Sequence, residues 1–376
     1  MLPNGLAEPK KSNRILELDA LRAMAAINLL LFHFTYLYQN KYGFTSPLGI
    51  AYPYGKYGVQ LFFMLSGLVN AMTLLGKHRS EDFLVARLIR VCPPFWAAML
   101  INFLLVCIMP LAAHPPTTAQ WLANLTIVPG LWGFECIEPV TWTLQVELLF
   151  YLVLLTWFSM GALRKPIVLT WVTLAITAVV CLPLKHGWLA EGAIPFAIAT
   201  SLNSVLILST LPLFLIGILL NERRCGRGSW LGHGFAIVGC GIVFHLIDQK
   251  DYNPAVTVLF TALLGFSAFG RIPVLRLKPI AFVAGISYSL FLLHNNLGST
   301  LIYHLDRWIG PWPALVLATV LVILIATTST YWFERPLNKW ISDRWFNPRQ
   351  SKLLSDPESF VFLRNNLSTP KIGKPK

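Results

Sequence analysis

Two ionisable side chains, Arg22 and His33, lie eleven residues apart in a segment that is otherwise largely apolar. In an α-helix, eleven residues at about 100° each come within about 20° of three full turns and rise about 16 Å, so both side chains would lie on one face. An ionisable group costs roughly 3 kcal/mol or more at the middle of a bilayer, and such a group usually marks a functional site. The pair therefore predicts an arginine at the mouth of a membrane site and an imidazole deep within it.

Two further ionisable residues are expected near the depth of His33. Hydropathy places Glu147 about seven residues from the outer end of its apolar segment, and His294 about ten residues from the outer end of its own. Two imidazoles and a carboxylate at one level can act as general acids and bases. We therefore predict His33, Glu147 and His294 as catalytic residues, although His294 also fits a structural histidine bonded to a neighbouring helix.

A second polar group is expected at the opposite level. Arg87 and Arg90 form an R-x-x-R pair ahead of an apolar segment, and Arg335 follows the last apolar segment. Arginine binds phosphate through paired hydrogen bonds and stays charged. We predict that Arg22, Arg87, Arg90 and Arg335 bind a phosphorylated cofactor from the cytoplasm. Arg87 and Arg90 also fit the ordinary excess of basic residues on the cytoplasmic side.

The elements that must position these side chains are transmembrane helices. Of 376 residues, 55% are hydrophobic and 12% charged, which is too apolar for a soluble globular protein. The predicted fold is an all-α polytopic membrane protein with about ten transmembrane helices. We expect a transmembrane domain over 1–335, followed over 336–376 by a cytoplasmic interfacial helix and a disordered basic tail. The ten apolar segments lie at about 20–38, 58–75, 93–110, 140–160, 166–183, 196–220, 229–247, 254–270, 280–304 and 311–333.

Basic residues are distributed unevenly between the two sides of these segments. With the N-terminus inside, 25 of the 30 Lys and Arg residues fall in cytoplasmic segments and five outside. This follows the positive-inside rule and predicts that both termini are cytoplasmic. The net charge of +13 therefore reflects topology, and no nucleic-acid partner is expected. The six cysteines show no C-x-x-C spacing, so we expect no metal site.

The two longest outer connections, at about 39–57 and 111–139, are rich in aromatic residues. The second holds Glu135 and Glu138 and has no Lys or Arg. Aromatic and acidic residues there fit stacking against a sugar or the entrance to a cavity, although Trp at a membrane interface is more often an anchor. Both interpretations remain open at this point.

Six motifs occur in order along the chain, and together they resemble those of the integral-membrane acyltransferase family 3. They are Arg22 with His33, Gly58–Gly67 (G-V-Q-L-F-F-M-L-S-G), Arg87–Arg90, Trp142–Glu147 (W-T-L-Q-V-E), Ser287–His294 and Glu334–Pro336. The resemblance implies transfer of an acyl group, acetyl in particular, from cytoplasmic acetyl-CoA to a hydroxyl of a cell-surface or exported polysaccharide or its lipid-linked precursor. It also implies acyl-CoA, a carbohydrate acceptor and the lipid bilayer as partners, and the bacterial cytoplasmic (inner) membrane as the location.

The layout inferred from the residues agrees with this expectation. The nucleotide end of acetyl-CoA would bind the arginines, while its pantetheine arm reaches toward His33 as general base. Two alternatives stay open. One is O-acylation of a small molecule such as a macrolide. The other is a proton-coupled secondary transporter, since buried His, Glu and Arg residues also suit a proton pathway, although no pair of similar halves is evident. The oligomeric state is left open.

Overall fold

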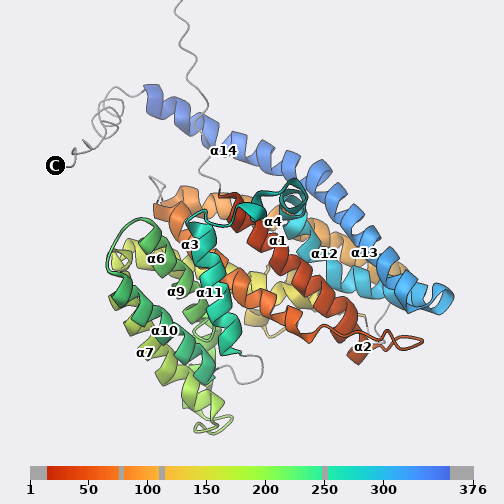
Figure 1. Cartoon of the computed structure of the whole chain (residues 1–376), viewed down its shortest axis with the longest axis horizontal. Helices are drawn as coiled ribbons and strands as arrows, with labels where there is room; N and C mark the ends of the chain where they lie inside the picture. Colours follow the sequence, from red (N-terminus) through yellow and green to blue (C-terminus); the bar gives the residue numbers. More distant parts are fainter. Residues whose placement is uncertain (1–14, 76–79, 110–114, 248–252, 356–376) are drawn as a thin grey trace, which may run out of the picture.

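The computed structural model describes residues 15–75, 80–109, 115–247 and 253–355, with side chains as far as residue 346. This part of the chain is a bundle of helices without a β-strand (Figure 1). The α-helices are α1 (Leu16–Leu31), α2 (Tyr38–Lys41), α3 (Gly58–Leu75), α4 (Ser80–Ile108), α5 (Thr118–Leu125), α6 (Trp142–Ser159), α7 (Pro166–Lys185), α8 (Ile194–Leu206), α9 (Leu211–Arg224), α10 (Trp230–Ile247), α11 (Pro254–Ala268), α12 (Lys278–Ile309), α13 (Pro311–Thr328) and α14 (Arg335–Ser355).

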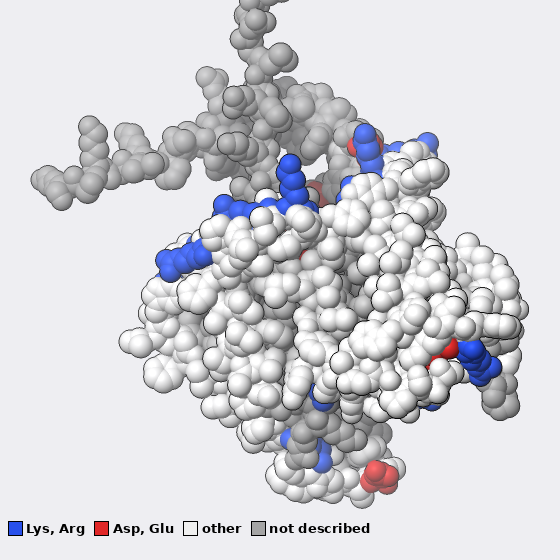
Figure 2. Space-filling view, turned by 45° about the vertical axis from the view of Figure 1, so that its right-hand side comes forward, with Lys and Arg blue, Asp and Glu red and all other residues white. Residues whose placement is uncertain are grey.

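The number of long apolar helices agrees with the sequence-based expectation. Nine helical stretches among the described residues are long and apolar enough to cross a membrane, and the shorter apolar helix Pro254–Ala268 matches the remaining predicted segment. The prediction of an all-α polytopic membrane protein with about ten spans is confirmed. Figure 2 shows the corresponding surface, in which Lys and Arg side chains lie at the edges of a broad uncharged band.

Three helix boundaries differ from the prediction. Helix α4 begins at Ser80, well before the predicted start near Pro93, and runs through Pro93 and Pro94. Proline removes one backbone hydrogen bond, but a membrane helix tolerates it where neighbouring groups satisfy the freed carbonyl. The predicted segment 196–220 is two helices, α8 and α9, because Ile207 has the left-handed φ of 50°. The last span continues through a π-helical segment, Ser329–Glu334, directly into α14.

The C-terminal predictions can be followed only in part. Helix α14 occupies the first half of the predicted interfacial and tail region, with Arg335 as its first residue. The expected disordered tail falls mainly on residues 356–376, outside the described residues. The boundary between a domain over 1–335 and a tail over 336–376 stays a prediction.

Helices α1, α3, α9, α12 and α13 form the most closely packed part of the bundle. The closest approach is between α3 and α9, where Gly67 lies against the backbone of Phe214, and Gly217 against the backbone of Met64. Small residues allow membrane helices to approach in this way. Helix α3 is therefore held firmly, and it carries several side chains of the site described below.

Each of the two long outer connections has a part that is buried against the bundle, although many of their described residues are exposed. In the first, the short 3-10 helix Pro53–Tyr57 packs on α1, with Gly55 against the carbonyl of Asn28. The Tyr52 backbone N–H donates to Thr35 Oγ1 at 3.1 Å. In the second, Glu138 is buried against α12 and is 1% exposed. The helices that follow these connections, α3 and α6, therefore begin well inside the protein.

Candidate functional site

A cavity of about 610 Å³ opens at the end of the bundle where α1 and α12 begin, called the inner end here. Its walls come from α1, α3, α4 and α12, together with residues around the start of α14. All four predicted phosphate-binding residues, Arg22, Arg87, Arg90 and Arg335, line it, and it is named the arginine cavity below. The structure thus brings together residues from three helices that are far apart in the sequence.

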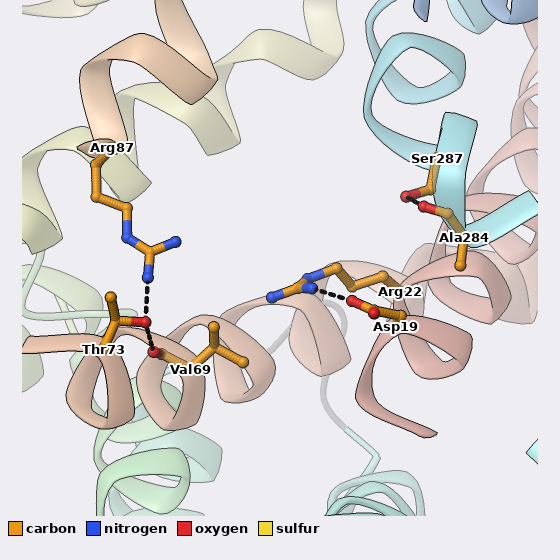
Figure 3. Close-up of polar contacts among 7 residues, drawn as sticks. All are labelled: Asp19, Arg22, Val69, Thr73, Arg87, Ala284 and Ser287. Carbon is orange, nitrogen blue, oxygen red and sulfur yellow. Dashed lines mark hydrogen bonds and ion pairs between the residues drawn. The ribbon is translucent and has the colours of Figure 1, made fainter. Parts of the chain in front are cut away.

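Two of these arginines are held by polar neighbours at their tips (Figure 3). Arg22 Nη1 donates to Asp19 Oδ1 at 2.7 Å, and both side chains are 15% exposed. Arg87 Nη2 donates to Thr73 Oγ1 at 2.7 Å, and Thr73 donates in turn to the Val69 carbonyl at 2.7 Å. Arg22 and Arg87 reach from different helices toward the same space. Positive charge held in this way suits a phosphorylated ligand, because guanidinium groups bind phosphate bidentately.

A narrower cavity of about 30 Å³ adjoins the arginine cavity and shares Arg22, Arg87 and Arg90 with it. Glu147 lines this narrow cavity. Glu147 Oε1 accepts hydrogen bonds from Tyr151 Oη at 2.7 Å and from Ser66 Oγ at 3.1 Å. Glu147 therefore lies in the same cavity as Arg22, Arg87 and Arg90.

Glu147 lies nearer the inner end than the histidines do, within the few helical turns of their level that the sequence allowed. Glu138 is hydrogen-bonded to Asn295, the neighbour of His294, so the chain enters α6 from the level of the histidines. Nine more residues of helix take Glu147 about 13 Å farther toward the inner end. The cause is Glu138, which is buried against α12 and sets the level at which the chain enters α6. The catalytic role of Glu147 stays a prediction.

His33 and His294, by contrast, are in direct contact and are called the histidine pair below. His294 Nε2 lies 3.1 Å from His33 Nδ1, and both rings are almost fully buried. His294 Nδ1 lies 2.8 Å from the Phe291 carbonyl, which can only accept, so this nitrogen carries the proton. The unprotonated His294 Nε2 then accepts from His33 Nδ1–H, which also donates to the Leu29 carbonyl at 2.7 Å.

This hydrogen-bond pattern defines the chemistry available to His33. In the neutral ring only one nitrogen carries a proton, so Nε2 of His33 has a free lone pair. When Nε2 of His33 takes a proton, the ring becomes an imidazolium, and its Nδ1–H already has two acceptors, the Leu29 carbonyl and His294 Nε2. His33 also lies in a π-helical segment, Phe32–Leu37, and such segments are frequent at functional sites.

Aromatic side chains lie between the narrow cavity and the histidine pair. Phe62 lines the narrow cavity, and its ring centroid is 5.8 Å from that of Phe291. The Phe291 ring is in turn 5.9 Å from the ring of His294. A ligand arm extending from the arginines to the histidines would therefore have to pass these two rings.

Several residues of the site were not singled out by sequence reasoning. Ser66, Thr73 and Tyr151 bind the charged groups described above, and Tyr288 Oη donates to the Val91 carbonyl at 2.9 Å beside both cavities. Ser66 and Tyr288 belong to motifs that were identified, and Tyr151 is one helical turn from Glu147, so motif membership and helical spacing were the available signals. For Thr73, on a different helix from Arg87, the sequence offered no comparable signal.

Glu138 was noticed in the sequence only as a loop acid. In the structure it is fully buried, and burial raises its pKa to about 7. It lies just before the membrane-spanning part of α6. Among the described residues, no group of three or more His, Cys, Asp or Glu side chains is placed to hold a metal ion.

One of three comparisons with known proteins matches most of the chain. The family model described as an acyltransferase domain, Acyl_transf_3, matches residues 15–331. Neither the search of curated proteins nor that of solved structures gave a match. The matched region includes the histidine pair, Glu147 and three of the four arginines of the cavity. On the extent of this match, the chain belongs to the integral-membrane acyltransferase family 3.

Proposed function

We propose that this membrane acyltransferase moves an acetyl group from cytoplasmic acetyl-CoA to a hydroxyl of a cell-surface or exported polysaccharide or its lipid-linked precursor. We place it in the bacterial cytoplasmic membrane with both termini inside. The observation that carries the proposal is the pairing of one arginine-lined cavity with a buried histidine pair. The two are linked through α1 and the π-helical segment that continues it, along which Arg22 and His33 are about 16 Å apart.

The arginine cavity suits the donor. It opens at the end of the bundle that the distribution of basic residues assigns to the cytoplasm. Its guanidinium groups would bind the phosphates of CoA, and the slender pantetheine arm would extend past Glu147 toward His33. The acyl group could then be delivered near the outer side while the charged nucleotide stays at the inner end.

The histidine pair suits the chemical step. His33 Nε2 would take the proton of the acceptor hydroxyl as its oxygen attacks the thioester carbonyl. The C–S bond then breaks, and the proton on Nε2 passes to the departing sulfur, giving the ester and free CoA. His294 Nε2 and the Leu29 carbonyl hold the His33 ring through its Nδ1–H. A general base of this kind contributes about 10²- to 10⁴-fold in rate.

The proposal can be tested in membranes of cells that express the protein. Radiolabelled acetyl-CoA is supplied at the cytoplasmic face, and base-labile label is measured in the polysaccharide fraction. We expect incorporation with the wild type and none with His33→Ala, while His33→Ala still binds CoA. His186→Ala, which removes an exposed histidine, is the matched control and should behave as wild type.

Three other outcomes would each change the conclusion. No transfer of label by the wild type would contradict the proposed reaction. Label in a soluble product of low mass would replace the polysaccharide acceptor by a small molecule. Normal incorporation by His33→Ala would show that His33 is not the base.

A further inference from the structure

Glu138 joins the second outer connection to α12 immediately beside the histidine pair. Its Oε1 accepts from Asn295 Nδ2 at 3.0 Å, and its Oε2 accepts from the backbone N–H of Asn296 at 3.1 Å. Asn296 Nδ2 donates back to the Ile137 carbonyl at 2.9 Å. Asn295 and Asn296 are the two residues that follow His294. Three hydrogen bonds therefore fix this part of α12 to the connection.

The connection is itself held rigidly at this point. Asn124, on α5, is 1% exposed. Its Oδ1 accepts from the Ile137 backbone N–H at 2.9 Å, and its Nδ2 donates to the Glu135 carbonyl at 3.0 Å. The backbone on the N-terminal side of Glu138 is thus clamped, and the position of the carboxylate is set by a second helix.

The choice of a carboxylate here is unusual. Burying a charged group is unfavourable unless it is fully hydrogen-bonded, and burial raises the pKa of Glu138 to about 7. An N–H in the middle of a helix normally donates to the carbonyl four residues earlier. Here the Asn296 N–H also donates to the Glu138 carboxylate, which constrains the helix locally. Both oxygens accept, and only the ionised carboxylate offers acceptors at both positions.

The constraint acts where the geometry of the histidine pair is determined. The His294 ring folds back on its own helix, with Nδ1 donating to the Phe291 carbonyl at 2.8 Å and lying 3.2 Å from that of Leu290. Its Nε2 is then aimed at His33. A small rotation or shift of α12 at Asn295 would move this nitrogen away from His33 Nδ1.

We propose that Glu138 is a positioning residue that holds His294 against His33, and that the second outer connection acts on the reaction through it. The inference rests on the proposed function, in which His294 orients the base His33. Glu138 itself contacts neither histidine among the described hydrogen bonds, so it acts through α12.

The test compares Glu138→Gln with the wild type in nanodiscs at pH 8, where the carboxyl is ionised. Acetyl-CoA is the donor and polysaccharide extracted from the host cells is the acceptor. Glutamine has nearly the same shape but presents one acceptor and one NH₂ group, which must face a donor. A misplacement of about 1 Å can cost about 100-fold in rate, so we expect kcat to fall about 10- to 100-fold. The KM for acetyl-CoA should stay close to its wild-type value, because the arginine cavity is unchanged.

Two further variants make the test specific. Glu135→Gln makes the same chemical change at an exposed position of the same connection and should leave kcat unchanged. In Glu138→Gln combined with Asn295→Asp, the glutamine NH₂ can donate to the new carboxylate while its oxygen accepts from the Asn296 N–H. This reversed pair should restore most of kcat, which a general loss of packing would not allow.

A measurement that needs no turnover separates this inference from the proposed function. Carbethoxylation by diethyl pyrocarbonate, followed by peptide mass spectrometry, reports the reactivity of His33 and His294. We expect both histidines to react faster in Glu138→Gln and to return to wild-type rates in the double variant. Wild-type kcat and reactivity in Glu138→Gln would overturn the positioning role alone, whereas absence of acetyl transfer by the wild type would overturn the proposed function.

Discussion

The close contact between α3 and α9 makes a quantitative prediction for Gly67→Ala. A Cβ atom at Gly67 would lie 2.0 Å from the Phe214 carbonyl oxygen, whereas ordinary contact begins at 3.4 Å. The two helices would therefore have to separate locally by about 1.4 Å, since a backbone oxygen cannot swing aside as a side chain can. The reciprocal contact at Gly217, where a Cβ would lie 2.1 Å from the Met64 carbonyl oxygen, prevents relief by a simple slide.

The size of the effect follows from the packing that would be lost. A gap of about 0.5–1 Å already removes a quarter to a half of the dispersion attraction between facing atoms. Forcing an extra methyl group into a packed core costs about 1–3 kcal/mol, and backbone contacts favour the upper end. Gly234→Ala in α10 is the matched control, because nothing lies within 4 Å of the new methyl group. Replacing Gly by Ala in a helix favours the helix by about 1 kcal/mol, so the control should be neutral or slightly stabilised.

The assay is thermal unfolding in detergent, followed by size-exclusion of a fluorescent fusion after heating. We expect Gly67→Ala to lose folded protein at a temperature several degrees lower than Gly234→Ala. Acetyl transfer should fall even below that temperature, because α3 carries Ser66 and Thr73 to the site. Equal melting temperatures for Gly67→Ala and Gly234→Ala would refute the close packing of α3 and α9.

Three further predictions concern binding, topology and pH. Arg87→Ala and Arg90→Ala should each weaken CoA binding in calorimetry by about 1.5–3 kcal/mol if the arginine makes a charge-assisted phosphate contact. Unchanged affinity in the double variant would mean that the two arginines belong only to the ordinary excess of basic residues on the cytoplasmic side. On a background without other cysteines, Glu135→Cys should react with an impermeant maleimide in sealed cells and Arg224→Cys only after permeabilisation; labelling of Arg224→Cys in sealed cells would invert the topology. Burial raises the pKa of Glu138 from 4.5 to about 7, so the folded protein holds this proton more tightly than the unfolded chain does. The resulting stabilisation of the folded protein is complete below about pH 4.5 and is lost as the pH rises through 7, a change of up to about 3 kcal/mol in the free energy of unfolding. Unfolding curves should show this pH dependence in the wild type and not in Glu138→Gln. Equal pH dependence in the two proteins would contradict the prediction.

The spans could be predicted because hydrophobic length is a strong signal in a membrane protein. Each apolar segment corresponds to a helix or a broken helix, but the ends were less certain. Pro93 and Pro94 suggested a helix start, yet the helix begins at Ser80, because composition does not reveal whether neighbours satisfy the carbonyls that proline leaves free. The break at Ile207 could not be predicted either, because the residue with the left-handed φ is not a glycine.

The site could be predicted where residues lie at helical spacing or in charge clusters, and not where loops set the depth. Arg22 and His33 lie in one continuous helical stretch, Leu16–Lys41, so the rise per residue related them directly. The depth of Glu147 depended on where the preceding connection lies, and an aromatic-rich connection can lie on the surface or enter the bundle. The partners of Glu138, on α12, are far away in the sequence, so the role of this carboxylate could not be inferred from its own neighbours.

The two π-helical segments, Phe32–Leu37 and Ser329–Glu334, affect how these helices can change during evolution. A π-turn accommodates one residue more than an α-turn, so each segment can be regarded as a single-residue insertion retained within a continuous helix. Deleting one residue from Thr35–Leu37 would restore a regular α-helix, and helix propensity alone does not oppose that change. The wide turn that contains His33 would be lost, so the direction of its ring relative to His294 would change. The length of these helices is therefore expected to be under stronger constraint than the identity of most residues in them, and an alignment of relatives should show substitutions here without gaps.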